Sequence, residues 1–529
     1  MSIPVPRVLV IGAGIGGLTA AALLAQQGLS VQVLERAASA GGKMRQVAVG
    51  AQLLDGGPTV LTMRWVFDEL FERLGLGLDD HLQLRRCEVL ARHSWGRHAS
   101  LDLLADADAS VAAIAAFSGG DEALRYRAFC RRAAEIYTTL EQPFMRSARP
   151  TPWSLVARVG WRGLPGLARI SPFSSMWREL GRYFHDPRLR QLFGRYATYC
   201  GSSPFDAPAT LMLVAHVERA SVWQIDGGMY RLAQTLAAAA EQQGAVLRYG
   251  QNVQRLLLSG GRVSGVETAA GQHIAADAVL FNGDVAALRS GALGASLQSA
   301  LGVAASNDAA RARARAKRSL SAVTWHCEAE AVGFDLSHHN VFFSDPDSHG
   351  YRREFEAIAA GRLPAKPTVY VCAQDRTAGL ASGRSKAGVE RLMCLVNAPA
   401  RADDAPLHPE EIDSCQTQMF AQLAHSGLQL RLLPQSLRRT TPQDFAALFP
   451  ATGGALYGAA SQGWLASFQR PGSTTQVPGL YLAGGSVHPG PGVPMAALSG
   501  QLAAAQIGLA LRSTRPSTPV LMPGGISMR

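Results

Sequence analysis

The stretch Arg7–Glu35, RVLVIGAGIGGLTAAALLAQQGLSVQVLE, constrains the fold of this chain more than any other. Its apolar run Val8–Ile11 is typical of a buried parallel strand. The glycine-rich loop Gly12–Gly17 follows, then a run rich in alanine and leucine that predicts a helix, then a second apolar strand that ends at Glu35. This order of strand, G-x-G-x-x-G loop, helix, strand and acid predicts a dinucleotide-binding βαβ unit.

Each glycine of the motif, and the acid after the second strand, has a physical role. Gly12 makes the tight turn from strand to helix, and Gly14 lets a pyrophosphate approach the positive end of the helix. Gly17 allows the helix to pack closely on the strand, and Glu35 accepts hydrogen bonds from ribose hydroxyls. The predicted dinucleotide contacts in this unit are Gly12, Gly14, Ile15, Gly16, Gly17, Glu35 and Arg36.

Length and charge limit the class of protein. A chain of 529 residues is long enough for two or three domains. Its net charge of +11 favours either nucleic acid or an anionic membrane surface as a partner. Because the sequence has no zinc-ligand spacing and no RNA-binding aromatic motif, we expect a membrane surface, no nucleic acid and no metal.

The cysteines and the apolar runs place the chain in a reducing compartment and outside the bilayer core. The seven cysteines are scattered and include no C-x-x-C, which predicts free, mostly buried thiols. Two uncharged stretches, Val8–Leu34 and Val493–Leu511, are long enough to span a membrane, but their glycines, proline and polar residues favour parts of a folded domain. We also expect no signal peptide, because the N-terminus lacks its cleavage pattern.

Two further glycine loops follow the first one and favour a flavin. Gly41 and Gly42 precede Lys43, and the run LLDGGPTVLT leads from a short strand into a Gly-Pro turn at Gly57–Thr59. A nicotinamide enzyme has no obvious use for a second glycine loop here. The longer FAD needs further close backbone contacts for its ribityl chain and ring.

The segment Pro143–Leu180 differs from the rest of the chain in composition. Tryptophans, including Trp153, Trp161 and Trp177, alternate with apolar residues and arginines, and no acid occurs from Arg146 to Arg178. This composition predicts a helical subdomain that dips into one leaflet of a membrane. The alternative is an ordinary lid over a core.

The C-terminal block, GLYLAGGSVHPGPGVPMAALSG, begins with a strand over Leu480–Leu482 and ends with a helix over Met495–Leu511. A junction of this kind points its free N–H groups at an anion or a polarised carbonyl, such as the N1–C2 edge of a flavin.

Together, the N-terminal unit, the block LLDGGPTVLTMRWVFDELF and the C-terminal block AGGSVHPGPGVPMAALSG resemble the carotenoid desaturase family, also called the phytoene dehydrogenase family, of FAD-dependent oxidoreductases. The last two blocks are similar to the branch that acts on 1-hydroxylated acyclic carotenoids, the hydroxyneurosporene or methoxyneurosporene desaturases. Phytoene desaturases usually carry a glycine-threonine-histidine-proline version of the last motif, where this chain has Gly485-Ser486-Val487-His488-Pro489.

The resemblance implies an α/β fold with α+β insertions. A discontinuous Rossmann-type FAD-binding domain would comprise residues 1–86, 223–290 and 452–512. A β-sheet substrate domain would comprise 87–142 and 291–451, next to the helical, membrane-associating or lid subdomain 143–222. The tail 513–529 is expected to be mobile.

The resemblance also implies site residues. Lys43 matches a basic residue near the phosphates or ribityl chain, and Val253 matches the residue whose backbone meets adenine. The flavin ring would be contacted by Gly57, Pro58, Thr59, Gly485, Ser486, Val493, Pro494 and Met495. The sequence names no acid or base. His488 is a candidate catalytic residue, and a turn residue packed near the flavin is an equally good interpretation.

The implied activity is the introduction of a C3–C4 double bond into a carotenoid such as 1-hydroxyneurosporene, on the way to spheroidene- or spirilloxanthin-type pigments of photosynthetic bacteria. A hydride would pass to N5 of FAD and a proton would leave the adjacent carbon, so that positioning and water exclusion carry most of the catalysis. Oxygen or a quinone would reoxidise the flavin. The protein would lie peripherally on the cytoplasmic face of the inner or photosynthetic membrane.

Three alternatives remain open from the sequence. The first is a phytoene desaturase of the same family. The second is a flavin amine oxidase, which shares the N-terminal block. The third is an isoprenoid-lipid escort protein that has lost its flavin, which the intact glycine motifs argue against.

Overall fold

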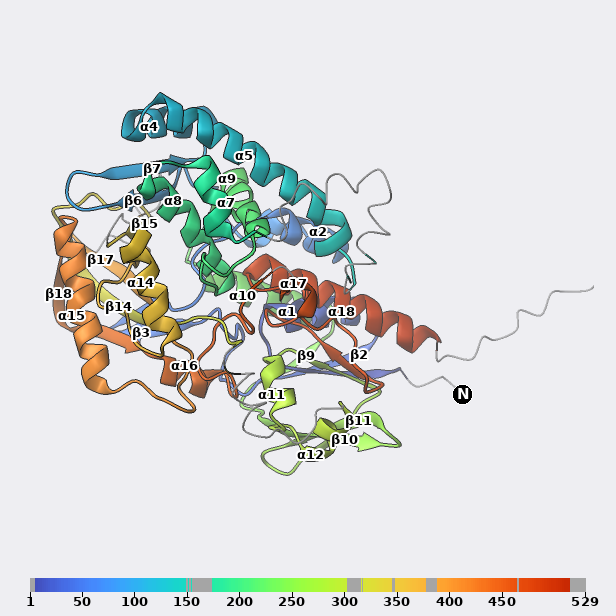
Figure 1. Ribbon diagram of the computed structural model, residues 1–529. Helices are drawn as coiled ribbons and strands as arrows, with labels where there is room; N and C mark the ends of the chain where they lie inside the picture. The colour runs from blue at the N-terminus through green and yellow to red at the C-terminus, as the bar shows by residue number, and fades with distance from the viewer. Residues whose placement is uncertain are drawn as a thin grey trace, which may run out of the picture.

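The computed structural model describes residues 5–148, 151, 154, 174–301, 315, 317–344, 348–376, 388–463 and 466–513. Figure 1 shows three parts: a sheet with helices α1 and α18 beside it, a larger sheet covered by α15, and a group of helices above both. The tail prediction for 514–529 lies outside the described residues.

A five-stranded parallel sheet contains the N-terminal unit. In spatial order its strands are β19 (Leu480–Leu482), β13 (Ala278–Phe281), β1 (Arg7–Ile11), β2 (Ser30–Leu34) and β9 (Val246–Arg248). Strands from three distant parts of the chain therefore form one sheet. The predicted strand–helix–strand order at the N-terminus is confirmed, because α1 (Ile15–Gln26) connects β1 to β2.

The two faces of this sheet bury alternate residues of its strands, as the period of two requires. Val8 and Val10 pack toward α1, α10 (Tyr230–Gln242) and α18 (Val493–Ser513). Leu9 belongs to a separate core with the antiparallel sheet of β10 (Val253–Ser259), β11 (Arg262–Thr268) and β12 (His273–Ala275). Strand β9 precedes these three strands in the chain but pairs with β2 at the edge of the parallel sheet.

The larger sheet has seven strands. In spatial order they are β18 (Gln429–Thr440), β14 (Ser321–Val332), β17 (Val389–Ala398), β16 (Val369–Ala373), β15 (His339–Phe342), β6 (Val89–Ser94) and β7 (Ser100–Leu104). Neighbouring strands are antiparallel except β15 and β6, which are parallel. Helix α15 (Pro409–His425) covers one face with Ile412, Met419 and Leu423, and the opposite face is turned toward the rest of the molecule.

Strand β18 was not predicted, because its sequence does not read as a strand. Its residues QLRLLPQSLRRT contain a proline, and Gln435 has a positive φ of 58°. Eight paired residues on β14 nevertheless hold it at the sheet edge, where a bulge near Cys327 accommodates the irregular residues.

Helices form a cap over the two large sheets (Figure 1). The cap consists of α4 (Ala107–Ser118), α5 (Gly120–Leu140), the π-helical turn η1 (Glu141–Met145), α7 (Met176–Tyr183), α8 (Pro187–Gly194), the 3₁₀ turns η2 (Arg195–Cys200) and η3 (Ala209–Met212), and α9 (Leu213–Ala220). The remaining elements are β3 (Gln46–Val49), β4 (Gln52–Asp55), α2 (Trp65–Arg73), α3 (Leu78–His81), β5 (Leu84–Arg86), β8 (Trp223–Ile225), α11 (Val285–Arg289), α12 (Ala295–Ala300), α14 (Ser348–Ala359), α16 (Pro442–Leu448) and α17 (Ala466–Gln469).

The structure corrects one member of the predicted membrane-facing set. Trp177 is 6% exposed, its ring lies beneath the guanidinium of Arg190 at 4.3 Å, and it packs against Phe205 and Tyr351. It is therefore a core residue of the cap, because its aromatic neighbours leave it no contact with lipid. Trp153 and Trp161 lie outside the described residues.

Among the described residues, one helix is long and apolar enough to cross a membrane, and this is α18. Over half of its most apolar window, 56%, is buried inside the protein. Gly500 of α18 packs so closely on α1 that an added Cβ would lie 2.2 Å from the carbonyl oxygen of Gly16. The apolar residues of α18 thus serve the packing of the parallel sheet and its helices.

Candidate cofactor and substrate site

A cavity of about 1000 Å³ lies where the parallel sheet, the cap and the inner face of the seven-stranded sheet meet. It opens at the carboxyl ends of β1, β2, β13 and β19, where ligands of open α/β sheets bind. Its wall includes all but two of the residues predicted for the cofactor and for catalysis: Gly12, Gly14, Ile15, Gly16, Glu35, Arg36, Lys43, Gly57, Pro58, Thr59, Val253, Gly485, Ser486, Val493, Pro494 and Met495.

The glycine loop after β1 brings backbone to the cavity. Gly12 has a φ of +98° and donates its N–H to the carbonyl of Leu34 at 2.8 Å, which fixes the start of the turn from β1 to α1 against the end of β2. Helix α1 starts with Gly14 as its N-cap, and no side chain caps it, so its first N–H groups are available to an anion. Gly17 lies behind the wall, where an added Cβ would be 2.3 Å from the Gly12 oxygen.

Glu35 is held by backbone N–H groups on both sides. Its Oε2 accepts from Ala13 N at 2.7 Å and its Oε1 accepts from Ala37 N at 2.8 Å. A carboxylate has about four acceptor positions, so the two remaining ones can accept from a ligand hydroxyl at the cavity wall. Glu35 is 8% exposed and lines the cavity, and its two hydrogen bonds from backbone N–H groups fix its orientation.

Two basic residues near the loop have different surroundings. The ammonium of Lys43 donates to the carbonyl of Leu456 at 2.6 Å, and burial lowers the pKa of Lys43, opposed by the nearby carboxylate of Asp284. The exposed Arg36 donates instead to the carbonyls of Ala447, at 2.7 Å, and Leu448 at the end of α16. Arg36 thus stabilises the C-terminus of that helix.

The Gly57–Thr59 loop and the C-terminal block close the cavity from two sides. Gly57 lies so near the backbone that an added Cβ would be 2.0 Å from the Lys43 carbonyl, and Thr59 Oγ1 lies 2.7 Å from the hydroxyl of Tyr370 on β16. In the C-terminal block, Ser486 Oγ accepts from Val285 N at 3.1 Å, and Arg470 donates to the carbonyl of Gly485 at 3.1 Å.

His488 does not line the cavity. It is 1% exposed, and its Nε2 lies 2.9 Å from the carbonyl of Phe144 and 3.1 Å from that of Ser147. Its ring also packs edge-on against Phe144 at 4.8 Å. The geometry corresponds to the turn residue that we gave as the alternative, and it connects the C-terminal block to the end of the cap.

Two wall residues were missed, although they directly follow strand β13 in the run Asn282-Gly283-Asp284. The Asn282 side chain donates to the Gly12 carbonyl at 3.1 Å and so supports the first glycine loop. Asp284 Oδ1 caps α11, while its buried Oδ2 has no hydrogen-bond partner among the described residues. The signal in the sequence that could have identified both residues is their position directly after a parallel strand, where polar residues often bind ligands.

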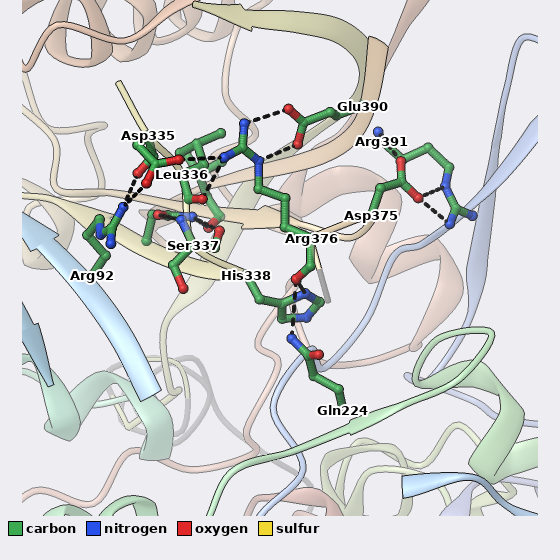
Figure 2. Close-up of polar contacts among 12 residues, drawn as sticks. Arg92, Gln224, Asp335, Leu336, Ser337, His338, Asp375, Arg376, Glu390 and Arg391 are labelled. Carbon is green, nitrogen blue, oxygen red and sulfur yellow. Dashed lines mark hydrogen bonds and ion pairs between the residues drawn. The ribbon is translucent and has the colours of Figure 1, made fainter. Parts of the chain in front are cut away.

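A group of potential metal ligands lies behind the cavity wall. We expected no metal from the sequence. The ligating atoms of His338, His339 and Cys372 lie within 4.8 Å of one another. His338 Nδ1 is 3.2 Å from the carbonyl of Arg376, and its Nε2 is 3.6 Å from the Cys372 thiol. Figure 2 shows that Arg376 is in turn fixed by a two-fold ion pair with Glu390.

This group supports the wall through Tyr370. His339 Nδ1 lies 2.7 Å from the Tyr370 hydroxyl, which also contacts Thr59. Burial lowers the pKa of His338 to about 4, so its imidazole is neutral at physiological pH. The histidines and the ion pairs around Arg376 thus form a hydrogen-bonded support for the Gly57–Thr59 loop.

The rest of the cavity wall is mostly apolar. The cap and the seven-stranded sheet contribute Leu140, Phe144, Met145, Leu211, Leu213, Val214, Val217, Met393 and Leu395. Such a surface can hold a hydrocarbon and exclude water from it.

The glycine loop after β1 and the unpartnered Oδ2 of Asp284 fit a flavin dinucleotide. Gly12, Gly14 and Gly16 present backbone to the cavity, and an added Cβ at Gly14 would lie 2.9 Å from Asn282 Nδ2, so only glycine fits beside the Asn282 side chain. The buried Oδ2 of Asp284 can accept from a ribityl hydroxyl, and Glu35 can accept from the ribose.

Comparison with known proteins gives three findings. The family described as flavin containing amine oxidoreductase matches residues 15–508. Two relatives are named hydroxyneurosporene desaturase: that of Rubrivivax gelatinosus is 51% identical, covering 99% of this chain and 97% of its own, and that of Cereibacter sphaeroides is 45% identical, covering 95% and 97%. The crystal structure of an oxidoreductase from Methanosarcina mazei shares the fold, with a TM-score of 0.59 and 17% identity, covering 95% of this chain and all of that one.

Proposed function

The chain belongs to the flavin containing amine oxidoreductase family and, within it, to the carotenoid desaturases, and we propose that it introduces the C3–C4 double bond into 1-hydroxylated acyclic carotenoids. The observation that carries this proposal is the 51% identity with a hydroxyneurosporene desaturase over 525 residues. The resemblance predicted from the glycine motifs is confirmed by this relative, and the cofactor is FAD, as those motifs predicted.

In this proposal, the glycine loop after β1, Glu35, Lys43 and Asp284 would hold FAD, and the Gly57–Thr59 loop and the C-terminal block would form the walls beside it. When bound, FAD supplies the two-electron oxidation by accepting a hydride. The apolar wall of the cap binds the carotenoid end and excludes water from the reacting C–H bonds. The cap thereby fixes which bond of the long chain is presented, which is the main catalytic contribution of this wall.

The route of the substrate and the electron acceptor complete the proposal. The net charge of +11 and the apolar, basic composition of residues 143–222 support peripheral binding to the cytoplasmic face of an anionic membrane, from which a carotenoid can enter. Oxygen or a quinone is the acceptor that reoxidises the flavin. In this proposal, the FAD-binding domain comprises residues 1–86, 223–290 and 452–512, and the substrate domain comprises residues 87–142 and 291–451.

The test uses the full-length, FAD-loaded protein in liposomes under anaerobic conditions, with 1-hydroxyneurosporene or phytoene as substrate. We expect flavin bleaching together with a red shift of the polyene absorbance for 1-hydroxyneurosporene and neither for phytoene. Reaction with phytoene instead would favour the phytoene desaturase alternative. Bleaching by amines alone would favour an amine oxidase, and no reaction with any carotenoid would overturn the proposal.

A further inference from the structure

Four polar side chains lie close together in the part of the cavity wall that is mostly apolar. Arg195, Tyr199 and Glu218 come from the cap, and Tyr370 comes from the seven-stranded sheet. All four line the cavity. Polar groups in an apolar pocket usually fix the orientation of a ligand, so their arrangement bears on which substrate end the pocket accepts.

The Glu218 carboxylate and the Arg195 guanidinium meet at one hydroxyl. Glu218 is 3% exposed; its Oε1 accepts from the Tyr196 hydroxyl at 2.6 Å and its Oε2 from the Tyr199 hydroxyl at 3.0 Å. Arg195 Nη1 donates to the same Tyr199 hydroxyl at 3.3 Å. The hydroxyl of Tyr199 therefore lies between a buried carboxylate and a partly buried cation.

The guanidinium has more donors than the described residues use. It lies 5.3 Å from the ring centres of both Tyr199 and Tyr370, and no ion pair joins it to any carboxylate in the described parts of the chain. A guanidinium carries five N–H donors, and a buried cation is strongly disfavoured unless acceptors surround it. The pocket thus offers a donor-rich site beside a carboxylate that can accept one more hydrogen bond.

The position of this site matches the chemistry of the substrate end. Tyr370 connects the cluster to Thr59, on the loop assigned to the flavin ring, through a contact of 2.7 Å. In a 1-hydroxylated carotenoid, one carbon separates the hydroxyl-bearing C1 from the reacting C3. A site for this hydroxyl must therefore lie next to the flavin loop, as the cluster does.

We infer that Arg195, Tyr199 and Glu218 form the subsite for the tertiary C1 hydroxyl of the carotenoid, and that this subsite selects hydroxylated over unsubstituted chain ends. The inference rests on the proposed function. The hydroxyl accepts from Arg195 and donates to Glu218, so the partly buried cation and the buried carboxylate each gain a partner. An unsubstituted end leaves them desolvated without one, which is the situation in which binding sites discriminate most strongly.

The test compares 1-hydroxyneurosporene with 1,2-dihydroneurosporene, which lacks only the hydroxyl, on the FAD-loaded full-length protein in liposomes. The wild type should favour the hydroxylated substrate at least ~100-fold in kcat/KM. Tyr199→Phe and Arg195→Met should lower this ratio about 10- to 100-fold. Arg195→Lys, which keeps the charge, should lower it less and replaces Arg195→Met if that variant does not fold.

Tyr196→Phe is the matched control. It removes the other tyrosine hydroxyl bound to Glu218, but Tyr196 does not line the cavity, so the ratio should stay within about threefold of the wild type. A wild-type ratio near one, or an equal loss on both substrates in Tyr199→Phe, would overturn the subsite while leaving the desaturase function intact. A wild type inactive on both carotenoids would overturn the proposed function itself.

Discussion

Glu354 shows at the scale of one residue how the cavity wall depends on protonation. It lies on α14, is 2% exposed, and accepts from the N–H and the hydroxyl of Thr368, a wall residue, at 3.2 and 2.7 Å. Its Oε1 has no hydrogen-bond partner among the described residues. Burial, which outweighs the two hydrogen bonds from Thr368, raises the pKa of Glu354 from 4.5 to about 7.

Because of this carboxyl, the stability of the wild type and that of a Glu354→Gln variant should depend differently on pH. The neutral form is favoured in the folded state, so its contribution to stability is fully present below pH 4.5 and is lost as the pH rises to about 7. Glu354→Gln removes this loss. The melting temperature of the variant minus that of the wild type should therefore increase between these two pH values, by an amount corresponding to on the order of 3 kcal/mol at most.

Thermal unfolding of both proteins across pH 4 to 8, at about one-unit steps, measures this difference. Glu356→Gln on the same helix changes an exposed carboxylate and should give a flat difference. If the difference in melting temperature for Glu354→Gln also stays constant across this pH range, the raised pKa of Glu354 is contradicted.

At the scale of an element, helix α16 connects the seven-stranded sheet to the cofactor end of the cavity. Thr441 and Asp444 form a capping box at its start, with Thr441 N donating to Asp444 Oδ2 at 2.8 Å. Its residues Phe445 and Leu448 line the cavity, and Arg36 binds the carbonyls at its end. A helix held at both ends in this way fixes that part of the wall.

Thr441→Ala should destabilise the protein by about 1 kcal/mol and weaken FAD binding by up to about fivefold, because the loosened helix forms part of the site. Asp106→Ala is the control: Asp106 caps α4 through Ala109 N at 2.7 Å, and α4 does not line the cavity. It should lower the melting temperature similarly without changing FAD affinity. Flavin fluorescence titration measures the affinity, and equal changes in both variants would contradict the role given to α16.

At the scale of the whole molecule, membrane binding should depend on the basic, apolar segment of the cap. With Trp177 in the core, the tryptophans left for an interface are Trp153 and Trp161. We expect Trp153→Ser combined with Trp161→Ser to weaken binding to anionic liposomes at least about tenfold, and high salt to weaken binding of the wild type. Liposome flotation measures both effects.

Leu509→Ser provides the control for this experiment. Leu509 is 63% exposed on α18, the helix with membrane-like length and composition, but most of α18 packs inside the protein. Its replacement should leave liposome binding unchanged. Loss of binding in Leu509→Ser, with none in the tryptophan variant, would place the membrane contact on α18.

The sequence by itself determined the nucleotide-binding unit, because its signals are local. The apolar period of β1 and β2, the glycines of the turn and the acid after β2 all act within 29 residues, Arg7–Glu35, and the structure has each element there. The same holds for the C-terminal strand and helix, β19 and α18. The family resemblance rested on such local blocks, and it is confirmed at 51% identity with a relative.

The tertiary structure alone decided what faces the substrate. Nothing local in the sequence marks β18 as a strand, and it forms because β14 offers it partners along its length. Arg195 and Tyr370 are 175 positions apart, and only the packing of the cap against the seven-stranded sheet brings the guanidinium to 5.3 Å from the tyrosine ring. Burial then decides which groups are charged and which donors remain for a ligand, because desolvation depends on every neighbour in space and not on neighbours in the chain.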